Sequence, residues 1–252
     1  MKDLHNYARS DATKFRDYLF AKGLNGASVA RIFGTLSTVL NLALSEFGLA
    51  FVNPFSNVYF DHSAGVKKRL PVKPEDITKV QEECYKADDE KRWLIALIAD
   101  TGMRLAEGVG LLWSDFIEQD GVRCVNIRPH PWRSLKTASS ARLIPLVGSA
   151  KWAAERILEK PDGSEFAFPN YNDGQRTNAN SASAALNKWL KTKIGRGYII
   201  HSFRHSMRDR LRAAECPSDV IDQICGWLTP GVGNSYGFGY PTCLLKLHID
   251  KV

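Results

Sequence analysis

The chain has 252 residues, of which 44% are hydrophobic and 24% are charged. That composition supplies enough apolar side chains for one large domain or two smaller ones, and it excludes general disorder. The net charge of +7 and the isoelectric point near 9.1 permit a polyanionic partner.

The termini and the cysteines narrow the class of protein further. The first residues, MKDLHNYARSD, lack the apolar stretch of a signal peptide. The longest apolar run, Trp93–Ala99, is far shorter than the ~20 residues that a membrane span needs. The five cysteines form no C-x-x-C pair, which is typical of core thiols in a reducing compartment. We therefore expect a soluble protein of the cytoplasm.

The N-terminal part predicts a small helical module. Residues 10–23 indicate a helix that Ser10 or Asp11 caps and that Gly23 ends, and residues 27–47 indicate a second, longer helix. Glycine, proline and asparagine then interrupt the pattern. Residues 66–74, VKKRLPVKP, are basic and proline-punctuated, and they predict a linker between a module at 1–65 and a larger domain at 75–252.

The larger domain predicts mainly helix with one small sheet. Helical patterns cover residues 73–87, 89–102, 149–160, 180–194, 201–214 and 217–226. Residues 121–129 and 141–147 are rich in β-formers around a polar stretch and predict an antiparallel pair. The tail is broken by glycine and proline and then becomes apolar. The expected fold class is mainly α with a small antiparallel β-sheet (α+β).

Positive charge gathers in one region. Lys188–Arg212 holds eight basic residues and one acid, an excess equal to the net charge of the whole chain. Within it, HSFRHSMRDR predicts an amphipathic helix. Its apolar stripe comprises Phe203, Met207, Leu211 and Ala214, and the remaining arc holds His201, Arg204, His205 and Arg208. A solvated basic face is one interpretation. The other is phosphate binding, because cations in a first helical turn oppose the helix dipole unless an anion is held there.

Four further stretches carry candidate residues, each with a plain structural alternative. Arg104 follows a glycine-marked turn, and Glu107 can orient it or form a surface ion pair. Lys136 lies at the polar turn of the sheet, where most lysines are simply solvated. Trp227 follows a glycine, and a tryptophan in such a place is more often a core residue. Tyr236 and Tyr240 lie among glycines, where exposed tyrosines are common.

Taken together, the order Arg, Lys, His-x-x-Arg, Trp and Tyr on a basic chain resembles the catalytic set of the tyrosine recombinase (phage-type integrase) family. The 23 residues from Arg204 to Trp227 and the nine from Trp227 to Tyr236 look typical of that family. The resemblance runs from about Asp11 to the C-terminus. Its first part looks like the later helices of the family's core-binding (SAM-like) domain and lacks the first helix or two, and Trp227 stands where many members have histidine.

The resemblance implies a reaction. Tyr236 would attack a DNA phosphodiester and form a 3′-phosphotyrosyl bond, which conserves the bond energy so that rejoining needs no ATP. Arg104 and Arg204 would hold the charged phosphate oxygens with their guanidinium forks, so that no metal or other cofactor is needed. His201 would take the phenol proton, and Lys136 would protonate the leaving 5′ oxygen. The implied catalytic set is Arg104, Lys136, His201, Arg204, Trp227 and Tyr236, with Glu107 and His205 in support.

Two tyrosines compete for the role of nucleophile. The nine-residue step from Trp227 favours Tyr236, and Gly237 and Gly239 loosen the backbone around it. Tyr240 precedes Pro241, which restricts the local chain, so we expect Tyr240 to be a structural anchor.

The implied partner is double-stranded DNA, bound by a homo-tetramer across two sites, with the free protein a monomer and no membrane involved. We expect the DNA backbone to contact Lys188, Lys191, Lys193, Arg196 and Arg208. The apolar tail at Leu244–Ile249 docks on a neighbouring subunit or packs within its own chain. The resemblance implies phage or mobile-element DNA integration in the bacterial cytoplasm. Two alternatives remain open: a type IB topoisomerase-like nicking and closing enzyme, and a non-catalytic DNA-binding remnant of an integrase.

Overall fold

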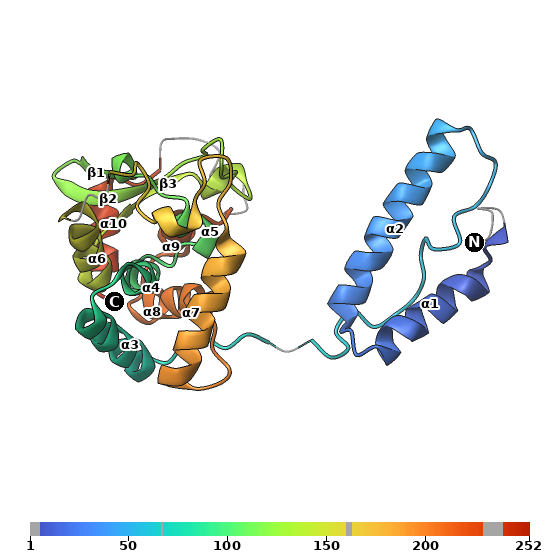
Figure 1. Ribbon diagram of the computed structural model, residues 1–252, viewed down its shortest axis with the longest axis horizontal. Coiled ribbons are helices and arrows are strands. Elements are labelled where there is room, and N and C mark those ends of the chain that lie inside the picture. Colours follow the sequence, from blue (N-terminus) through green and yellow to red (C-terminus); the bar gives the residue numbers. More distant parts are fainter. Residues whose placement is uncertain (1–5, 67, 160–162, 229–238) are drawn as a thin grey trace. The chain divides into compact units, whose positions relative to one another are not determined.

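The computed structural model describes residues 6–66, 68–159, 163–228 and 239–252. Its chain divides into two compact units, Met1–Lys68 and Arg69–Val252 (Figure 1). The division falls inside the predicted linker, whose second half belongs to the second unit. Val72 is buried there, and its backbone N–H donates to Ser206 Oγ at 2.6 Å. An apolar residue in a basic segment thus ties the segment to the core.

The first unit is built on two helices, α1 (Arg9–Ala21) and α2 (Gly26–Glu46). Their facing sides bury a small core with the segment that follows them, comprising Ala12, Leu19, Val29, Phe33, Phe55 and Val58. Neither residue predicted to cap α1 does so: the helix begins at Arg9, and Asp11 lies in its first turn, where it accepts the Ala8 N–H at 2.8 Å. Asn25 caps α2 by accepting the Ser28 N–H.

By length and composition alone, α2 could cross a membrane, and among the helices of the described residues it is the only one that could. A search for unbroken apolar runs does not find it, because α2 intersperses apolar residues with small uncharged ones. Helices of soluble proteins can have the same composition, and Val29 and Phe33 of α2 pack in the core of the first unit.

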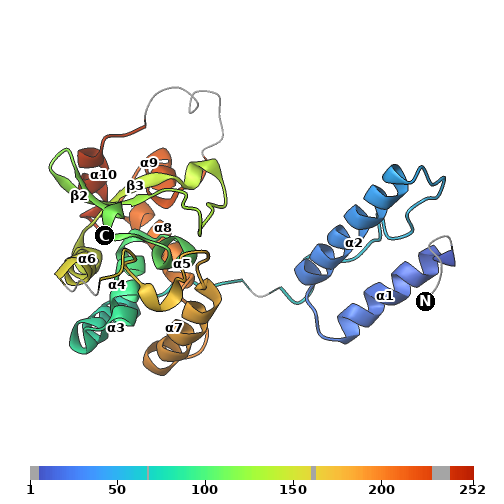
Figure 2. The ribbon, with the colours of Figure 1, turned by 45° about the horizontal axis from the view of Figure 1, so that its top comes forward.

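The second unit contains the sheet. In the described residues, β1 (Phe116–Gln119), β2 (Val122–Ile127) and β3 (Arg142–Pro145) form an antiparallel sheet in the order β1-β2-β3. Gln119 faces Val122 and Val125 faces Ile144. The helices are α3 (Pro74–Ala87), α4 (Glu90–Thr101), α5 (Leu105–Val109), α6 (Gly148–Glu159), α7 (Ala179–Ile194), α8 (Ser202–Ala213), α9 (Ser218–Cys225) and α10 (Thr242–Ile249). The sheet lies at one end of this unit and α3 and α7 at the other (Figures 1 and 2).

Helix α4 is the centre of this unit, because every residue from Trp93 to Thr101 is buried. It packs against α6, α3 and α8. The predicted stripe of α8 is confirmed for Phe203, Met207 and Leu211, which are fully buried, whereas Ala214 follows the end of the helix and is partly buried.

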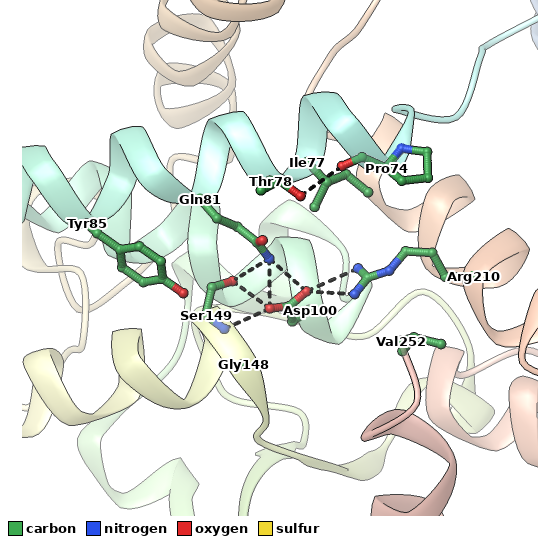
Figure 3. A pocket seen from close by; sticks show the side chains of 10 residues that line it. All are labelled: Pro74, Ile77, Thr78, Gln81, Tyr85, Asp100, Gly148, Ser149, Arg210 and Val252. Atoms are coloured by element: carbon green, nitrogen blue, oxygen red, sulfur yellow. Dashed lines mark hydrogen bonds and ion pairs between the residues drawn. The ribbon is translucent and has the colours of Figure 1, made fainter.

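A buried carboxylate joins four of these helices (Figure 3). Asp100, at the end of α4, accepts hydrogen bonds from Ser149 of α6, Gln81 of α3 and Arg210 of α8. These four residues, together with Val252, line part of a cavity of about 330 Å³. A buried charge is stabilising only when its partners are complete, and here the partners fix the relative positions of four helices.

Three elements, β1, α5 and α10, were not predicted from the sequence. The Leu244–Ile249 tail lies within α10, which packs on β3 of its own chain and buries Leu245 and Ile249. Thr242 Oγ1 donates to Asp120 at 3.0 Å and so fastens the start of α10 to the turn between β1 and β2. In the single chain the tail therefore packs on its own sheet, and docking on a neighbouring subunit stays a prediction for the assembly on DNA.

Candidate active site

Arg104 lies where α4 ends and α5 begins. Gly102 ends α4 with a φ of +62°, and a Cβ there would lie 2.9 Å from the Met207 side chain, so only glycine fits the turn. Arg104 then donates its backbone N–H to Glu107 Oε2 at 2.8 Å and its guanidinium to Glu107 Oε1 at 2.5 Å. Glu107 is buried, so this pair is an internal one and not the surface pair that the sequence also allowed.

Arg204 is buried although it lies on the polar arc of α8. Its guanidinium donates to two backbone carbonyl oxygens, Gly102 O at 2.8 Å and Cys225 O. These carbonyls come from the ends of α4 and α9, so the tertiary fold holds the side chain in place. Burial lowers the pKa of Arg204 to about 10, which leaves the guanidinium protonated at neutral pH.

His201 is the N-cap residue of α8. Burial, followed by the nearby charges of Arg69, His205, Arg204 and Arg104, lowers the pKa of His201 to about 4. The imidazole is therefore neutral at physiological pH and able to accept a proton. Only Arg204 then brings a full positive charge to the first turn of α8. His205 is exposed, with its ring 5.3 Å from that of His201.

Trp227 lies against two guanidinium groups. Arg204 lies 4.7 Å and Arg208 4.6 Å from the centre of the indole. Arg208 was expected at the DNA backbone, and in the described structure it is partly buried and stacked on this ring. The ring thus lies beside Arg204 and contributes to the wall of the same site.

Lys136 lies on the connection between β2 and β3, and its side chain is exposed. Next to it, Thr137 Oγ1 lies 3.0 Å from Ser140 Oγ, which in turn accepts a hydrogen bond from Arg104 at 2.9 Å. The lysine-bearing loop is thereby joined to Arg104.

The basic residues of segment 188–212 do not all face solvent, and one of those expected at the DNA backbone, Lys193, has a partner in the fold. Lys193 pairs with Glu83 at 2.5 Å and Arg210 with Asp100, while Arg204 is buried. Only some of the basic side chains of this segment face solvent, and they include Lys188, Lys191 and Arg196. The sequence shows where the charges lie along the chain but not which of them have partners in the fold.

Tyr236 lies outside the described residues. Tyr240 is an anchor, as the sequence predicted. Its hydroxyl donates to Asp219, and its backbone N–H and C=O both bond the side-chain amide of Gln223, at 2.8 and 3.0 Å. The hydrogen bond to Asp219 raises the pKa of Tyr240, which makes its phenol a poorer nucleophile.

Two residues of this site, Ser140 and Arg142, were not predicted from the sequence. Both follow Lys136 in SLKTASSARLIPL, but a serine and an arginine next to a strand give no signal of burial. Ser140 is fully buried, and Arg142 is nearly so. Arg104 and Arg142 both bond the Glu107 carboxylate, and Arg204 lies close enough to feel its charge. Three guanidinium groups beside one carboxylate give the site an excess of positive charge suited to an anion.

A comparison with protein families identifies the kind of reaction that such an anion site serves. The model of the phage integrase family matches residues 72–236. The chain belongs to the phage integrase family. As a member of this family it is a site-specific DNA recombinase, an enzyme that cleaves and rejoins DNA strands. No curated protein matches the chain.

Solved integrase structures share the fold of this phage integrase. An integrase of the Tn1549 transposon (residues 82–397), in complex with circular intermediate DNA, is 18% identical with a TM-score of 0.68, covering 98% of this chain and 86% of that one. A lambda integrase tetramer bound to a Holliday junction is 17% identical with a TM-score of 0.68, covering 93% and 66%. The XerA recombinase is 12% identical with a TM-score of 0.51, covering 98% and 80%.

Proposed function

We propose that this integrase breaks and rejoins double-stranded DNA at paired sites, with Tyr236 as the nucleophile. The observation that carries the proposal is the convergence of Arg104, Arg204 and neutral His201 on one electropositive site. The family match also ends at residue 236, whereas Tyr240 lies beyond it and is bonded to α9.

In the proposed cleavage step, the Tyr236 oxygen forms a bond to phosphorus, and the bond from phosphorus to the 5′ oxygen breaks. The phenol proton passes to His201, and the Lys136 ammonium donates a proton to the leaving 5′ oxygen. Arg104 and Arg204 stabilise the charge on the non-bridging oxygens. Rejoining is the reverse, with the 5′ hydroxyl as nucleophile.

The neutral state of His201 supports its role as the proton acceptor. A protonated imidazole would already hold the proton that the step requires it to take. The low pKa has a cost, because the imidazolium that forms is destabilised by burial first and then by the neighbouring positive charges. An anionic phosphate bound beside it offsets that cost, so we expect DNA to raise the pKa of His201.

We propose that the second unit, Arg69–Val252, is the catalytic domain and that the first is a partial core-binding domain. The partner would be double-stranded DNA, and the assembly on DNA a homo-tetramer, in line with the tetramer seen for lambda integrase on a Holliday junction. Activity on DNA requires the compartment that holds the genome, which for a phage or mobile-element enzyme is the bacterial cytoplasm.

The test is covalent trapping on nicked suicide DNA, whose cleaved fragment diffuses away and prevents rejoining. The wild-type protein should form an adduct that survives denaturing electrophoresis, without metal or ATP. Absence of an adduct would leave only a DNA-binding remnant. Relaxation of supercoiled DNA that lacks paired sites, without any recombinant product, would instead identify a nicking and closing enzyme.

A further inference from the structure

Arg142, the first residue of β3, joins three segments of the catalytic unit. Its side chain is 3% exposed. The guanidinium donates to Ser140 O at 2.6 Å, to Ile224 O at 2.8 Å and to Glu107 Oε2 at 3.0 Å. Its donor fork is therefore directed at the lysine-bearing loop, the end of α9 and the start of α5.

Two of these three partners also hold Arg104. Nη1 of Arg104 donates to Glu107 Oε1 at 2.5 Å and to Ser140 Oγ at 2.9 Å. Arg142 thus bonds both residues that accept from the Arg104 guanidinium. The two arginines do not need to touch, because they share both neighbours.

Glu107 is suited to link them. Its burial raises the pKa of the carboxyl, but the charge of Arg142 and the hydrogen bonds from Arg142 and Arg104 hold that pKa below its ordinary value. The carboxylate is ionised at neutral pH and has donors on both oxygens. If Arg142 were lost, Glu107 would lose one of the two guanidinium groups that bond its carboxylate, and only the backbone N–H and Nη1 of Arg104 would hold it.

The hydrogen bond to Ile224 O fixes the position of Arg142 itself. Ile224 and Cys225 present successive carbonyl oxygens at the end of α9, the first to Arg142 and the second to Arg204. Gly226 follows with a φ of +66°, and a Cβ there would lie 2.7 Å from a nitrogen of Arg142. The backbone therefore packs directly on the guanidinium, which leaves it one position.

We propose that Arg142 is a positioning residue for DNA cleavage, acting on Arg104 through Glu107 and Ser140. This inference rests on the proposed function. A lysine would keep the charge, but its single ammonium group lacks the planar fork and would not reach all three partners. Because a displacement of about 1 Å can reduce a reaction rate by orders of magnitude, Arg104 should lose much of its effect when these partners relax.

The experiment measures single-turnover cleavage of DNA with a 5′-bridging phosphorothiolate at the scissile position. Its sulfur leaves without a proton and does not rejoin, so even slow cleavage accumulates and Lys136 is not required. Arg142→Lys should cleave this DNA about tenfold more slowly or worse, with a dissociation constant for DNA within about twofold of wild type. A defect that vanished on this substrate would mean that Arg142 acts through Lys136, and would overturn the proposal.

A double-variant comparison separates positioning from general destabilisation. In an Arg104→Ala background, Arg142→Lys should slow cleavage by less than a further factor of about two, because the Arg104 side chain that Arg142 positions is already absent. The same loss in both backgrounds would overturn the proposal. If thermal melting shows that Arg142→Lys does not fold, Arg142→Gln makes the same test, since its side-chain amide keeps a donor at this position but removes the guanidinium fork.

Arg123→Lys is the matched control, because Arg123 lies on the neighbouring strand β2, half exposed, 3.9 Å from Glu155. It should cleave at the wild-type rate. Failure of the two hypotheses can be told apart. A wild-type protein that forms no adduct refutes the proposed function, whereas equal cleavage by wild type and Arg142→Lys refutes only the role of Arg142.

Discussion

At the scale of single residues, the fold holds Arg204 in place, and we propose that the same side chain binds the scissile phosphate. Its guanidinium bonds Gly102 O and Cys225 O. A guanidinium has five donors, so this geometry leaves donors for a phosphate. We expect Arg204→Lys to bind DNA nearly as well as wild type and to cleave it about 100-fold to 1,000-fold more slowly, because the lost fork matches charge that peaks in the transition state.

The measurement is single-turnover cleavage beside a DNA-binding titration, with thermal melting to confirm the fold. Arg212→Lys, at the exposed end of α8, is the control and should resemble wild type in both assays. A proportional loss of binding and cleavage by Arg204→Lys would refute the transition-state role.

His201 makes a prediction about pH and stability. Its pKa is about 4 in the folded protein, against an ordinary value of 6.5. Between these values the unfolded chain binds more protons, so this residue lowers the stability of the wild type as pH falls from about 6.5 to about 4. The free energy of unfolding of wild type, relative to His201→Asn, should therefore decrease across that window and stay constant above it.

Urea unfolding at a series of pH values measures this difference. His62→Asn, an exposed histidine of the first unit, is the control and should follow wild type. Parallel curves for wild type and His201→Asn between pH 4 and 7 would show that His201 is not held neutral.

At the scale of elements, the turn at Gly102 both ends α4 and presents a carbonyl to Arg204. Gly102→Ala places a Cβ 2.9 Å from Met207 at a φ of +62°. We expect a loss of more than about 2 kcal/mol in the free energy of unfolding, from the left-handed backbone and the clash together. Cleavage by the folded fraction should fall as well, because the acceptor of Arg204 is displaced.

Gly121→Ala is the matched control for this change. Gly121 has a φ of +72°, and a Cβ there would meet nothing within 4 Å. It should lose only about 1–2 kcal/mol from the left-handed backbone, and its cleavage rate should be that of wild type. Equal losses in the two variants would show that the contact with Met207 is unimportant.

The periodic helices and the strands β2 and β3 could be predicted from the sequence, whereas β1, α5 and α10 could not. The patterns of α3, α4, α7 and α8 agree with the structure to within about two residues, in the range that fraying and short caps allow. β1 was missed although Asp120-Gly121 between two β-rich runs is a hairpin signal. α5 has five residues, too few for any periodicity.

The candidate site divides in the same way. Arg104, Lys136, His201 and Arg204 could be proposed from the sequence because their types and spacing resemble a known catalytic set. Arg142 and Ser140 were not, because their role depends on burial and on partners far away in the chain, such as Ile224. The pairing of Lys193 with Glu83 was hidden for the same reason, since 110 residues separate them.

At the scale of the whole molecule, the exposed part of the basic segment should govern the salt dependence of DNA binding. Lys188, Lys191 and Arg196 are exposed, whereas Lys193 is paired. Replacing these three by glutamine should reduce the slope of log K against log salt by about 0.9 for each phosphate that is no longer neutralised. Fluorescence anisotropy from dilute to physiological salt measures the slope.

Lys193→Gln is the informative comparison in that assay. Because Lys193 already neutralises Glu83, it should change the slope less than any of the three exposed residues does. A slope that the triple variant leaves unchanged would mean that the DNA backbone lies on another face.

The central claim is that Tyr236 attacks DNA from within a site built on Arg104 and Arg204. The most direct measurement is covalent trapping of the wild-type protein, Tyr236→Phe and Tyr240→Phe on suicide DNA, followed by mass spectrometry of the peptide that carries the nucleotide. We predict adducts for wild type and Tyr240→Phe, both on the peptide that contains Tyr236, and none for Tyr236→Phe. An adduct formed by Tyr236→Phe and lost in Tyr240→Phe would contradict the assignment.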